Sequence, residues 1–239
     1  MLLVDHTCAT PAEDLALDEL LLDEAEATEG PREFLRLWEP PRPMVVIGRS
    51  SRVAEEVRVE ECRRRDVPFF RRSSGGAAIV TGPGCLMYAV VLSYQEYPAL
   101  RAIDLAHRHV MGKLVGALHS LVPGVEFQGT CDLTHEDRKF SGNALRCRRE
   151  HLLYHGTLLY DFPLELIEQC LAAPPRTPDY REGRAHSAFV TNLPVSRESL
   201  RSALLAAWPT SGEYRDWDQA ALQRIADEKF RSDAWNAKL

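Results

Sequence analysis

The sequence predicts an α+β fold in which a mixed, mainly antiparallel sheet is flanked by helices. Short apolar segments of strand-like composition follow one another at hairpin-like spacing, and the few helical stretches among them do not alternate as in a doubly wound sheet. With 45% hydrophobic and 27% charged residues, the composition is typical of a soluble α/β protein. Because the 239 residues include no Pro/Gly/Ser-rich linker, we expect one domain over residues 1–239.

The first helix is predicted from its start signal. Residues 10–13, Thr-Pro-Ala-Glu, place a hydroxyl at the N-cap, a proline at the first helical position and a glutamate at the third. Leu17, Leu20 and Leu21 then recur at helical spacing. This pattern predicts an amphipathic helix that ends at about Gly30.

Three short strands and a helix are expected next. Phe34–Trp38 and Met44–Ile47 have strand composition, and the prolines between them prevent regular pairing of the two. Residues 57–65 predict a short helix. Residues 68–72 predict a strand that leads into the loop Ser73-Ser74-Gly75-Gly76.

A hairpin and a long helix follow. Residues 77–80 and 86–93 are apolar and flank the turn Thr81-Gly82-Pro83-Gly84, which predicts a β-hairpin. Residues 103–121 carry apolar side chains at helical spacing. The remaining expected elements are strands at residues 140–145 and 152–160 and helices at residues 164–172, 197–207 and 219–230.

Charge and apolar runs exclude several classes of partner. A net charge of -6 provides no positive face for nucleic acid. No apolar run approaches the roughly 18 residues of a membrane span. The opening residues also lack the basic start and long apolar centre of a secretory signal. We therefore expect a cytoplasmic protein without nucleic-acid or membrane partners.

The six cysteines are scattered along the chain without a Cys-x-x-Cys pair. This spacing indicates neither a zinc site nor a disulfide framework. The sequence therefore predicts buried or idle thiols and no tightly bound metal.

The segment Arg71-Arg72-Ser73-Ser74-Gly75-Gly76-Ala77-Ala78 has the composition of a ligand-binding loop. Successive glycines let backbone amides approach a ligand closely, and arginines neutralise a phosphate or a carboxylate. A Gly-Gly pair between strands is more often a turn or a bulge. The adjacent arginine pair favours a ligand site here.

Lys139 stands out because only four of the 29 basic residues are lysines. It lies beside small residues at the start of a predicted strand, where a lysine can hold a fixed positive charge against a phosphate or a developing oxyanion. A solvated lysine in a turn is the alternative.

His155 and Thr157 share one face of the strand predicted at residues 152–160, so both can line one cavity. A purely structural histidine is the alternative. His151 lies on the same face but gives no metal geometry, because a further ligand is missing.

Taken together and in this order, these segments resemble the lipoate–protein ligase family, which belongs with the biotin protein ligases. The likeness runs from about residue 10 to about residue 195. The early matches are residues 10–19 to P-A-x-N-L-A-L-D-E, residues 35–38 to L-R-x-Y/W and residues 45–49 to V-V-I-G-R. The later matches are residues 71–78 to R-R-x-S-G-G-G-A, residues 129–133 and 138–144 to G-x-N-D-L and K-K-I-S-G-x-A, residues 155–159 to H-G-T-L-L and residues 190–193 to V-T-N-L.

The resemblance implies a biotin/lipoate protein ligase-like (class II synthetase-like) fold and an enzyme that attaches lipoate or octanoate to a carrier lysine. The implied partner is a lipoyl carrier domain of a 2-oxoacid dehydrogenase complex or of the glycine cleavage H protein. Lys139 would be the catalytic lysine that steadies the acyl-adenylate phosphate or the acyl carbonyl, and a ligase would use ATP and Mg²⁺. The implied acyl- and adenylate-binding residues are Arg71, Arg72, Ser74, Gly75, Gly76, Ala77, Asp132, Ser141, Gly142, His155, Gly156 and Thr157.

The chain departs from the family pattern around the activation step. Ala77 replaces the third glycine of the loop, and Thr81-Gly82-Pro83-Gly84-Cys85 replaces the H-D-x-G-N of many ligases. The length leaves no room for the C-terminal accessory domain that many full ligases carry. We therefore expect either a separate accessory subunit or an activity that needs no adenylate formation.

Three functions stay open. The first is an ATP-dependent lipoate–protein ligase. The second is an octanoyl or lipoyl transferase with Cys131 as its nucleophile, although Phe127 stands where one such group has its cysteine. Cys85 and Cys170 are weaker candidates. The third is a non-catalytic acyl-binding relative, which the presence of Lys139 disfavours.

Overall fold

The structure is a computed structural model that describes residues 1–173 and 177–239. Its strands are β1 (Leu2–Asp5), β2 (Phe34–Trp38), β3 (Met44–Ile47), β4 (Phe69–Arg71), β5 (Ile79–Thr81), β6 (Cys85–Ser93), β7 (Val125–Gln128), β8 (Asp132–His135), β9 (Arg138–Cys147) and β10 (His151–Leu159). They form a seven-stranded sheet, β1-β2-β6-β10-β9-β8-β7, and a three-stranded sheet, β4-β3-β5. The pairs β1–β2 and β3–β4 are parallel, and the other pairs in the described chain are antiparallel.

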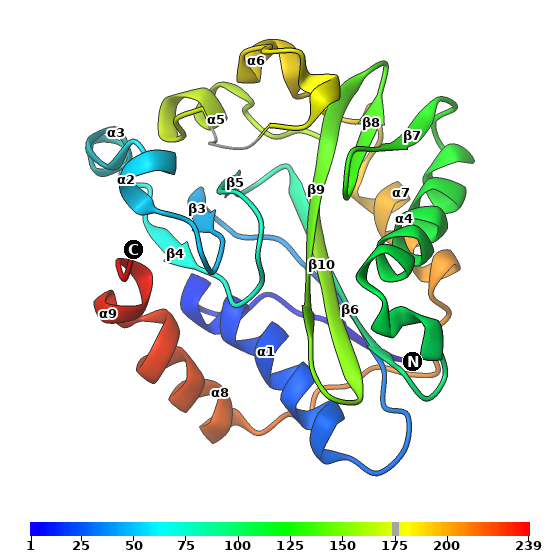
Figure 1. Ribbon diagram of the computed structural model, residues 1–239. Coiled ribbons are helices and arrows are strands. Elements are labelled where there is room, and N and C mark those ends of the chain that lie inside the picture. Colours follow the sequence, from blue (N-terminus) through cyan, green and yellow to red (C-terminus); the bar gives the residue numbers. More distant parts are fainter. Residues whose placement is uncertain (174–176) are drawn as a thin grey trace.

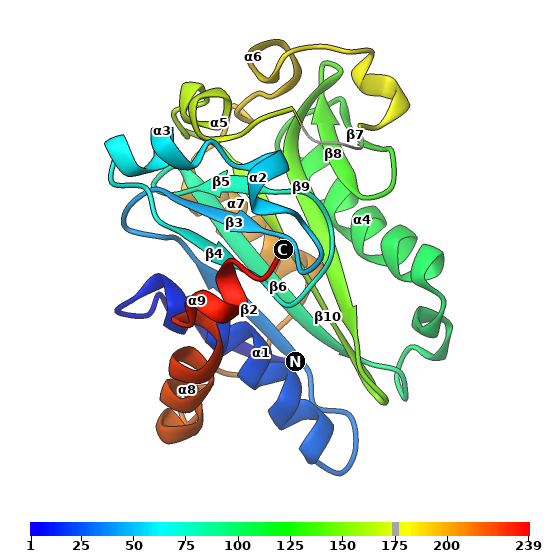
Figure 2. The ribbon, with the colours of Figure 1, turned by 60° about the vertical axis from the view of Figure 1, so that its left-hand side comes forward.

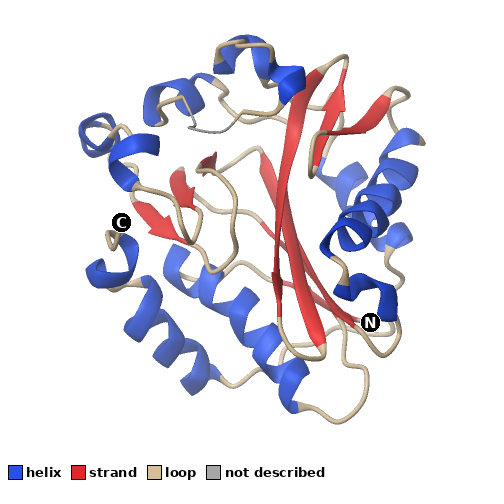
Figure 3. Ribbon diagram, viewed as in Figure 1, coloured by secondary structure: helices blue, strands red, loops and turns tan. Residues whose placement is uncertain are grey.

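Helices cover both faces of the larger sheet (Figures 1 and 3). On one face, α1 (Pro11–Ala27) packs against β6 and β10; on the other, α4 (Ile103–His119) packs against β7 and α7 (Arg197–Ala207). His155 of β10 forms a hydrogen bond with α1, and the preceding Tyr154 forms one with α4. Because consecutive residues of a strand point to opposite faces, α1 and α4 lie on opposite faces of the sheet. The other helical elements are α2 (Val53–Glu56), α3 (Val59–Arg64), η1 (Pro98–Arg101), α5 (Glu165–Cys170), η2 (Asp179–Arg181), α6 (His186–Phe189), α8 (Gln219–Ile225), η3 (Ala226–Phe230) and α9 (Asp233–Asn236).

α1 begins with the predicted capping box, because the Thr10 hydroxyl accepts from the amide of Glu13 and the Glu13 carboxylate accepts from that of Thr10. The expected amphipathic character is wrong. The helix is buried on most of its surface, including Asp14, Asp18 and Glu19. α8 and η3 cover the side that an amphipathic helix would expose (Figure 2). These three acidic residues therefore form ion pairs within the protein, whereas Asp23 near the end of the helix stays partly exposed.

The predicted hairpin at residues 77–93 is also wrong. The turn forms, with the amide of Cys85 donating to the carbonyl oxygen of Gly82 over 3.0 Å, but β5 pairs with β3 and β6 lies in the larger sheet. A Cβ on Gly82 would lie 2.9 Å from the Cα of Pro43, and one on Gly84 would lie 2.2 Å from the carbonyl oxygen of Asp161. Gly82 and Gly84 therefore allow the chain to pack closely against neighbouring backbone where it crosses from one sheet to the other.

The sequence did not reveal β1, β7 and β8, which are four residues each. β7 and β8 also carry polar residues in at least half of their positions, so they lack an apolar alternation long enough to recognise. Of the helices described here, none combines the length and the apolar character needed to span a membrane.

Candidate functional site

A cavity of about 350 Å³ lies between the larger sheet and the loop that follows β4. Its volume is at the lower end of the about 300–1,000 Å³ typical of small-molecule sites. The apolar part of the wall consists of Leu15, Trp38, Val46, Ile79, Met87 and Ala144. The polar part includes Arg72, Asp132, Lys139, Asn143, His155 and Thr157.

Lys139 lies at the start of β9 and its ammonium group is bound to a carboxylate. Its Nζ is 2.7 Å from Oδ1 of Asp132, and its side chain is 28% exposed. The hydroxyl of Tyr180 donates to Oδ2 of Asp132 over 2.8 Å. Burial, followed by the Asp132 carboxylate, raises the pKa of Tyr180, so this hydroxyl stays a donor. Asp132 is therefore held from two sides and fixes the Lys139 ammonium at the cavity.

A bulge in β9 turns Lys139 toward the cavity. Thr134 of β8 pairs with Lys139, but the β8 residue before it pairs with Ser141, so Phe140 is an extra residue in β9. Without the bulge, Lys139 would share a face with Ser141 and not with Gly142. In the structure, a Cβ on Gly142 would lie 3.1 Å from Cε and Nζ of Lys139. The missing side chain of Gly142 leaves room for the lysine.

Asn143 organises the neighbouring part of the wall. Its Nδ2 donates to the carbonyl oxygen of Cys131 over 2.8 Å, and its Oδ1 accepts from the hydroxyl of Tyr88 over 2.5 Å. A Cβ on Gly156 of β10 would lie only 1.8 Å from this Oδ1. The glycine of the His-Gly-Thr segment therefore makes room for Asn143, which holds the loop that carries Cys131.

Arg72 holds the loop after β4 from the inside. Its guanidinium donates to the carbonyl oxygens of Val46, Gly75 and Ala77 over 3.1, 2.5 and 3.0 Å, and its Nε donates to Oγ of Ser74 over 3.1 Å. Burial lowers the pKa of Arg72 to about 10. Within the described residues, no carboxylate forms an ion pair with it. A buried cation whose hydrogen-bond partners are all neutral attracts an anion to the cavity.

The loop that follows β4 packs closely against the residues that follow β3. A Cβ on Gly48 would lie 1.9 Å from the carbonyl oxygen of Gly76, whose φ is +90°. The amide of Arg49 donates to the carbonyl oxygen of Ser74 over 2.8 Å, and Oγ of Ser51 donates to that of Gly76 over 3.2 Å. Close approach requires glycine at position 48, and the positive φ favours it at position 76.

His155 belongs to a chain of buried polar groups that reaches into α1. Its Nε2 is 2.6 Å from Oγ of Ser74, and its Nδ1 is 3.2 Å from Oδ2 of Asp18. Arg36 donates to Asp18 and to Asp14, over 2.6 Å in each case, and all three ionic side chains are buried. The orientation of the imidazole is therefore set from both sides.

The two aspartates share one guanidinium, and their pKa values shift in opposite directions. Burial raises the pKa of Asp14 to about 6, against the effect of Arg36. Burial acts in the same direction on Asp18, but Arg36 and the hydrogen bond from His155 outweigh it and lower the pKa. Asp18 is therefore the carboxylate that stays charged beside the imidazole.

Lys139 and His155 both line the cavity, at separate positions along β9 and β10. Ala144 pairs with His155 across β9 and β10. Lys139 precedes Ala144 by five residues, of which Phe140 is the extra one. The remaining four strand positions correspond to about 14 Å. An extended eight-carbon acyl chain fits within that distance.

Residues 10–203 match the family model of the lipoyl protein ligase A/B catalytic domain. The chain belongs to this family. It is 31% identical over 151 residues to probable lipoate-protein ligase A of Mycoplasma pneumoniae. The aligned residues cover 63% of this chain and 43% of that relative. It is 25% identical to octanoyltransferase LipM of Geobacillus kaustophilus, over 98% of this chain and 97% of that relative. The chain thus spans less than half the length of the Mycoplasma relative, and the family includes ligases and transferases.

Solved structures of lipoate ligases share the fold. A putative lipoate protein ligase of Thermoplasma acidophilum with bound lipoic acid has a TM-score of 0.83 at 20% identity, covering 100% of this chain and 98% of that one. A second structure, from the structural analysis of a bi-partite lipoate protein ligase and its E2 lipoyl domain of T. acidophilum, has a TM-score of 0.81 at 20% identity, covering 99% of this chain and 95% of that one. These structures confirm the predicted lipoate–protein ligase-like fold.

Ten of the fourteen residues that we expected at the site line the cavity of this lipoyl ligase-family protein. They are Arg72, Gly76, Ala77, Cys131, Asp132, Lys139, Gly142, His155, Gly156 and Thr157. The other four, Arg71, Ser74, Gly75 and Ser141, do not line it. Ser74 and Ser141 instead bond to His155 and Asn143, and Gly75 accepts from Arg72. These three residues therefore do not line the cavity but bind residues that do.

Arg71 is completely buried, and its guanidinium lies outside the cavity. Its acceptors are the backbone oxygens of Gly48, Arg49, Ser51, Trp235 and Asn236. The geometry therefore corrects the expected ligand-binding role: Arg71 crosslinks three chain segments.

Cys131 lines the cavity, but its thiol is not activated. Its Sγ donates to the carbonyl oxygen of Asn143 over 2.9 Å. Burial, and then the neighbouring Asp132, raises its pKa, and the opposing effect of Lys139 does not reverse this. A nucleophilic cysteine needs the opposite, a lowered pKa.

Sequence reasoning missed much of the wall, including Asp18, Trp38, Met87 and Asn143. Asp18, Trp38 and Asn143 lie within the matched motifs, so their positions were visible. Asp18 gave a further signal: it is an acidic residue one turn after Asp14 in a helix whose neighbours are apolar. An acidic side chain among such apolar neighbours is expected to be buried, and a buried carboxylate needs a cation as its partner.

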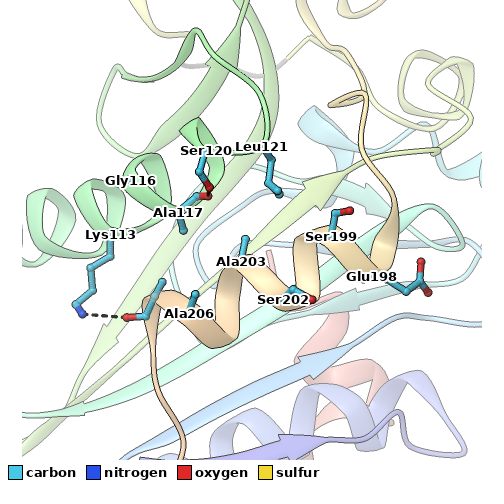
Figure 4. Close-up of a pocket in the computed structure, with 11 residues that line it drawn as sticks. Lys113, Gly116, Ala117, Ser120, Leu121, Glu198, Ser199, Ser202, Ala203 and Ala206 are labelled. Atoms are coloured by element: carbon cyan, nitrogen blue, oxygen red, sulfur yellow. Dashed lines mark hydrogen bonds between the residues drawn. The ribbon is translucent and has the colours of Figure 1, made fainter.

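A second cavity, of about 680 Å³, is an open groove between α4 and α7 (Figure 4). Small residues such as Gly116, Ala117 and Ala203 line it, and Nζ of Lys113 donates to the carbonyl oxygen of Ala207 over 3.0 Å. Its lining includes no histidine or cysteine. Across residues 1–173 and 177–239, no three His, Cys, Asp or Glu side chains are grouped to hold a metal ion.

Proposed function

We propose that this protein transfers a lipoyl or octanoyl group to a lysine of a lipoyl carrier domain. The acyl chain lies in the 350 Å³ cavity, and its carbonyl lies beside Lys139. The observation that carries the proposal is this cavity itself. It joins a carboxylate-bound lysine to an apolar wall, and the about 14 Å of strand between Lys139 and His155 accommodates an eight-carbon chain.

Lys139 acts on the reacting carbonyl. The amine of the carrier lysine attacks the acyl carbon, a C–N bond forms, and the bond to the leaving group breaks. Negative charge develops on the carbonyl oxygen during this step, and the amine proton passes to solvent. Because Asp132 already fixes the ammonium at 2.7 Å, the cation stabilises that charge without reorganising.

The acyl donor in this proposal is an acyl-adenylate, which makes the protein a lipoate–protein ligase that needs ATP and Mg²⁺. The state of Cys131 supports this choice, because a thiol with a raised pKa that donates to a carbonyl oxygen is a poor nucleophile. Arg72 adds a second cation, which is buried and has no carboxylate partner among the described residues, and this suits an anionic donor.

A cysteine-dependent transferase is the second candidate. Cys131 lines the same cavity as Lys139, and the chain is similar to an octanoyltransferase over nearly the whole length of both. In that case the Cys131 thiolate attacks the acyl thioester of a donor carrier, releases the carrier thiol and holds the acyl group until the acceptor lysine displaces it.

The partner in either case is a lipoyl domain of a 2-oxoacid dehydrogenase complex or the H protein of glycine cleavage. The T. acidophilum neighbour, described together with its E2 lipoyl domain in one structural analysis, supports this choice. The same relative is bi-partite, which supports a separate accessory subunit for the activation step.

The test is the intact mass of a purified lipoyl domain after incubation with the protein. One set of reactions contains lipoate, ATP and Mg²⁺, and the other contains octanoyl-loaded acyl carrier protein without ATP. We expect a mass increase in the first set that persists in Cys131→Ser and is lost in Lys139→Met. An increase confined to the second set and lost in Cys131→Ser would establish the transferase. No increase in either set, with or without the accessory subunit, would refute both.

A further inference from the structure

The C-terminal residues 230–239 lie outside the segment that matches the family model, which ends at residue 203. They nevertheless contact the loop that forms one wall of the cavity. We infer that Trp235 and Asn236 are positioning residues that fix Arg71 and, through it, the wall formed by residues 72–77. The inference rests on the proposed function, because it assigns these residues to the acyl cavity.

Four hydrogen bonds join this segment to Arg71. The amide of Arg71 donates to Oδ1 of Asn236 over 2.8 Å, and its carbonyl oxygen accepts from Nε1 of Trp235 over 2.7 Å. Its side chain donates to the carbonyl oxygens of Trp235 and Asn236 over 3.0 and 3.1 Å. Both the main chain and the side chain of Arg71 are therefore held.

These contacts occupy the open edge of a sheet. β4 is an edge strand that pairs with β3, so the outward-facing backbone groups at Arg71 have no strand partner. Buried backbone groups need a partner, and exposed strand edges need cover. The indole N–H of Trp235 and the amide oxygen of Asn236 supply those partners from side chains.

Arg71 directly precedes the residue that shapes the wall. Arg72 holds the carbonyl oxygens of Gly75 and Ala77, so a shift of the Arg71 backbone displaces the anchor of the whole loop. The cross-link also reaches Gly48, against which Gly76 is packed. Loss of the C-terminal contacts is therefore transmitted to the cavity.

Residues 229 and 231, at the start of this C-terminal segment, are tied to α1, which forms the opposite wall of the cavity. Lys229 binds Glu19 over 2.6 Å and Arg231 binds Glu13 over 2.6 Å, both on α1. The same helix carries Asp18, which orients His155. Figure 2 shows α8 and α9 running from α1 to β4. One segment thus sets the spacing between the two walls.

The test compares amide hydrogen exchange and octanoate binding in Asn236→Leu, Trp235→Phe and a control, Trp217→Phe. Trp217 lies in the same part of the chain, and its indole N–H bonds only to Gln219 among the described residues. Exchange of residues 72–78 is expected to accelerate by about tenfold in the first two variants, and octanoate binding to weaken by about fivefold. The control is expected to match the wild type.

Asn236→Asp separates the two roles of this side chain, because it keeps an oxygen acceptor for the Arg71 amide and removes only the Nδ2 donor to the carbonyl oxygen of Phe230. We expect exchange of residues 72–78 to stay within about twofold of the wild type there. Unchanged exchange at residues 72–78 in Asn236→Leu and Trp235→Phe would overturn the inference, as would an equal acceleration at every amide. A wild-type protein that binds neither octanoate nor lipoate would refute the proposed function, while the exchange data would still decide the role of Trp235 and Asn236.

Discussion

Arg36 and Arg71 are both completely buried beside the cavity, yet their charges are balanced in different ways. Arg36 lies between Asp14 and Asp18, so the wall formed by α1, β2 and β10 is held by buried ion pairs. Arg71 bonds to five backbone oxygens, so the loop wall is held by hydrogen bonds to main chain.

The difference follows from what each wall consists of. α1 and the strands supply side chains at fixed spacing, so carboxylates can be placed around a cation. A loop with glycines brings its carbonyl oxygens together, and a guanidinium with five donors satisfies them. The ionic wall should therefore depend on charge and pH, and the loop wall on backbone geometry.

Replacing Arg36 tests the ionic wall most severely. Arg36→Met leaves two buried carboxylates without their cation, which is expected to lower the free energy of unfolding by about 3–5 kcal/mol. Urea denaturation at pH 7 measures this loss. The matched control adds Asp14→Asn and Asp18→Asn to Arg36→Met and is expected to recover most of it. A loss below about 1 kcal/mol, or no recovery, would show that the ion pairs do not hold this wall.

Replacing Arg71 is expected to have a smaller effect. Arg71→Met removes donors from backbone oxygens but leaves no charge uncompensated, so we expect a loss of about 1–3 kcal/mol in the same urea experiment. A loss as large as that of Arg36→Met would remove the contrast between the two walls.

The pH dependence of stability separates the two aspartates around Arg36. The pKa of Asp14 is raised from 3.8 to about 6 by burial, so its contribution to stability is fully present below pH 3.8 and is lost as the pH rises through about 6. The pKa of Asp18 is lowered, because Arg36 and His155 outweigh its burial. Its contribution is therefore present above pH 3.8 and is lost as the pH falls through the folded pKa.

Urea denaturation between pH 3 and 7 checks this contrast. The stability of the wild type relative to Asp14→Asn is expected to fall as the pH rises, and that relative to Asp18→Asn is expected to rise. Arg71→Met serves as the control and is expected to show little pH dependence relative to the wild type. Slopes of the same sign for the two aspartate variants would contradict the assignment.

Ser74 joins the two walls, since its hydroxyl accepts from Arg72 and bonds to His155. Ser74→Ala is expected to lower the free energy of unfolding by about 1 kcal/mol. In a double-mutant cycle with Asp18→Asn, which acts on the same imidazole, we expect a coupling of at least about 0.5 kcal/mol. The same cycle with Glu126→Gln, an exposed residue of β7, should be additive. Additivity in both cycles would mean that the walls are independent.

The long elements were predictable because their signals are local. α4, α7, β6 and β10 are continuous apolar or periodic runs, and the capping box of α1 lies within four residues. The partner of a strand is not a local property. The turn at residues 81–84 is the same whether the chain folds back on itself or crosses to another sheet, so the hairpin prediction failed there.

The candidate site was predictable where residue type alone signals chemistry. The glycine loop, Lys139 and the His-Gly-Thr segment were visible from sequence. The bulge at Phe140 was not, because it changes which face a side chain lies on without changing the composition. The roles of Arg36 and Arg71 depend on groups up to 165 residues away, which no sequence window contains.

The account depends above all on Lys139 as the cation at the reacting end of an acyl cavity. The most direct measurement is the single-turnover rate of acyl transfer to a lipoyl domain by the wild type and by Lys139→Met, with octanoate affinity measured in parallel. We predict that the rate falls by about a hundredfold or more while octanoate affinity changes by less than about fivefold. An unchanged rate, or a loss of affinity that accounts for the whole loss of rate, would contradict the account.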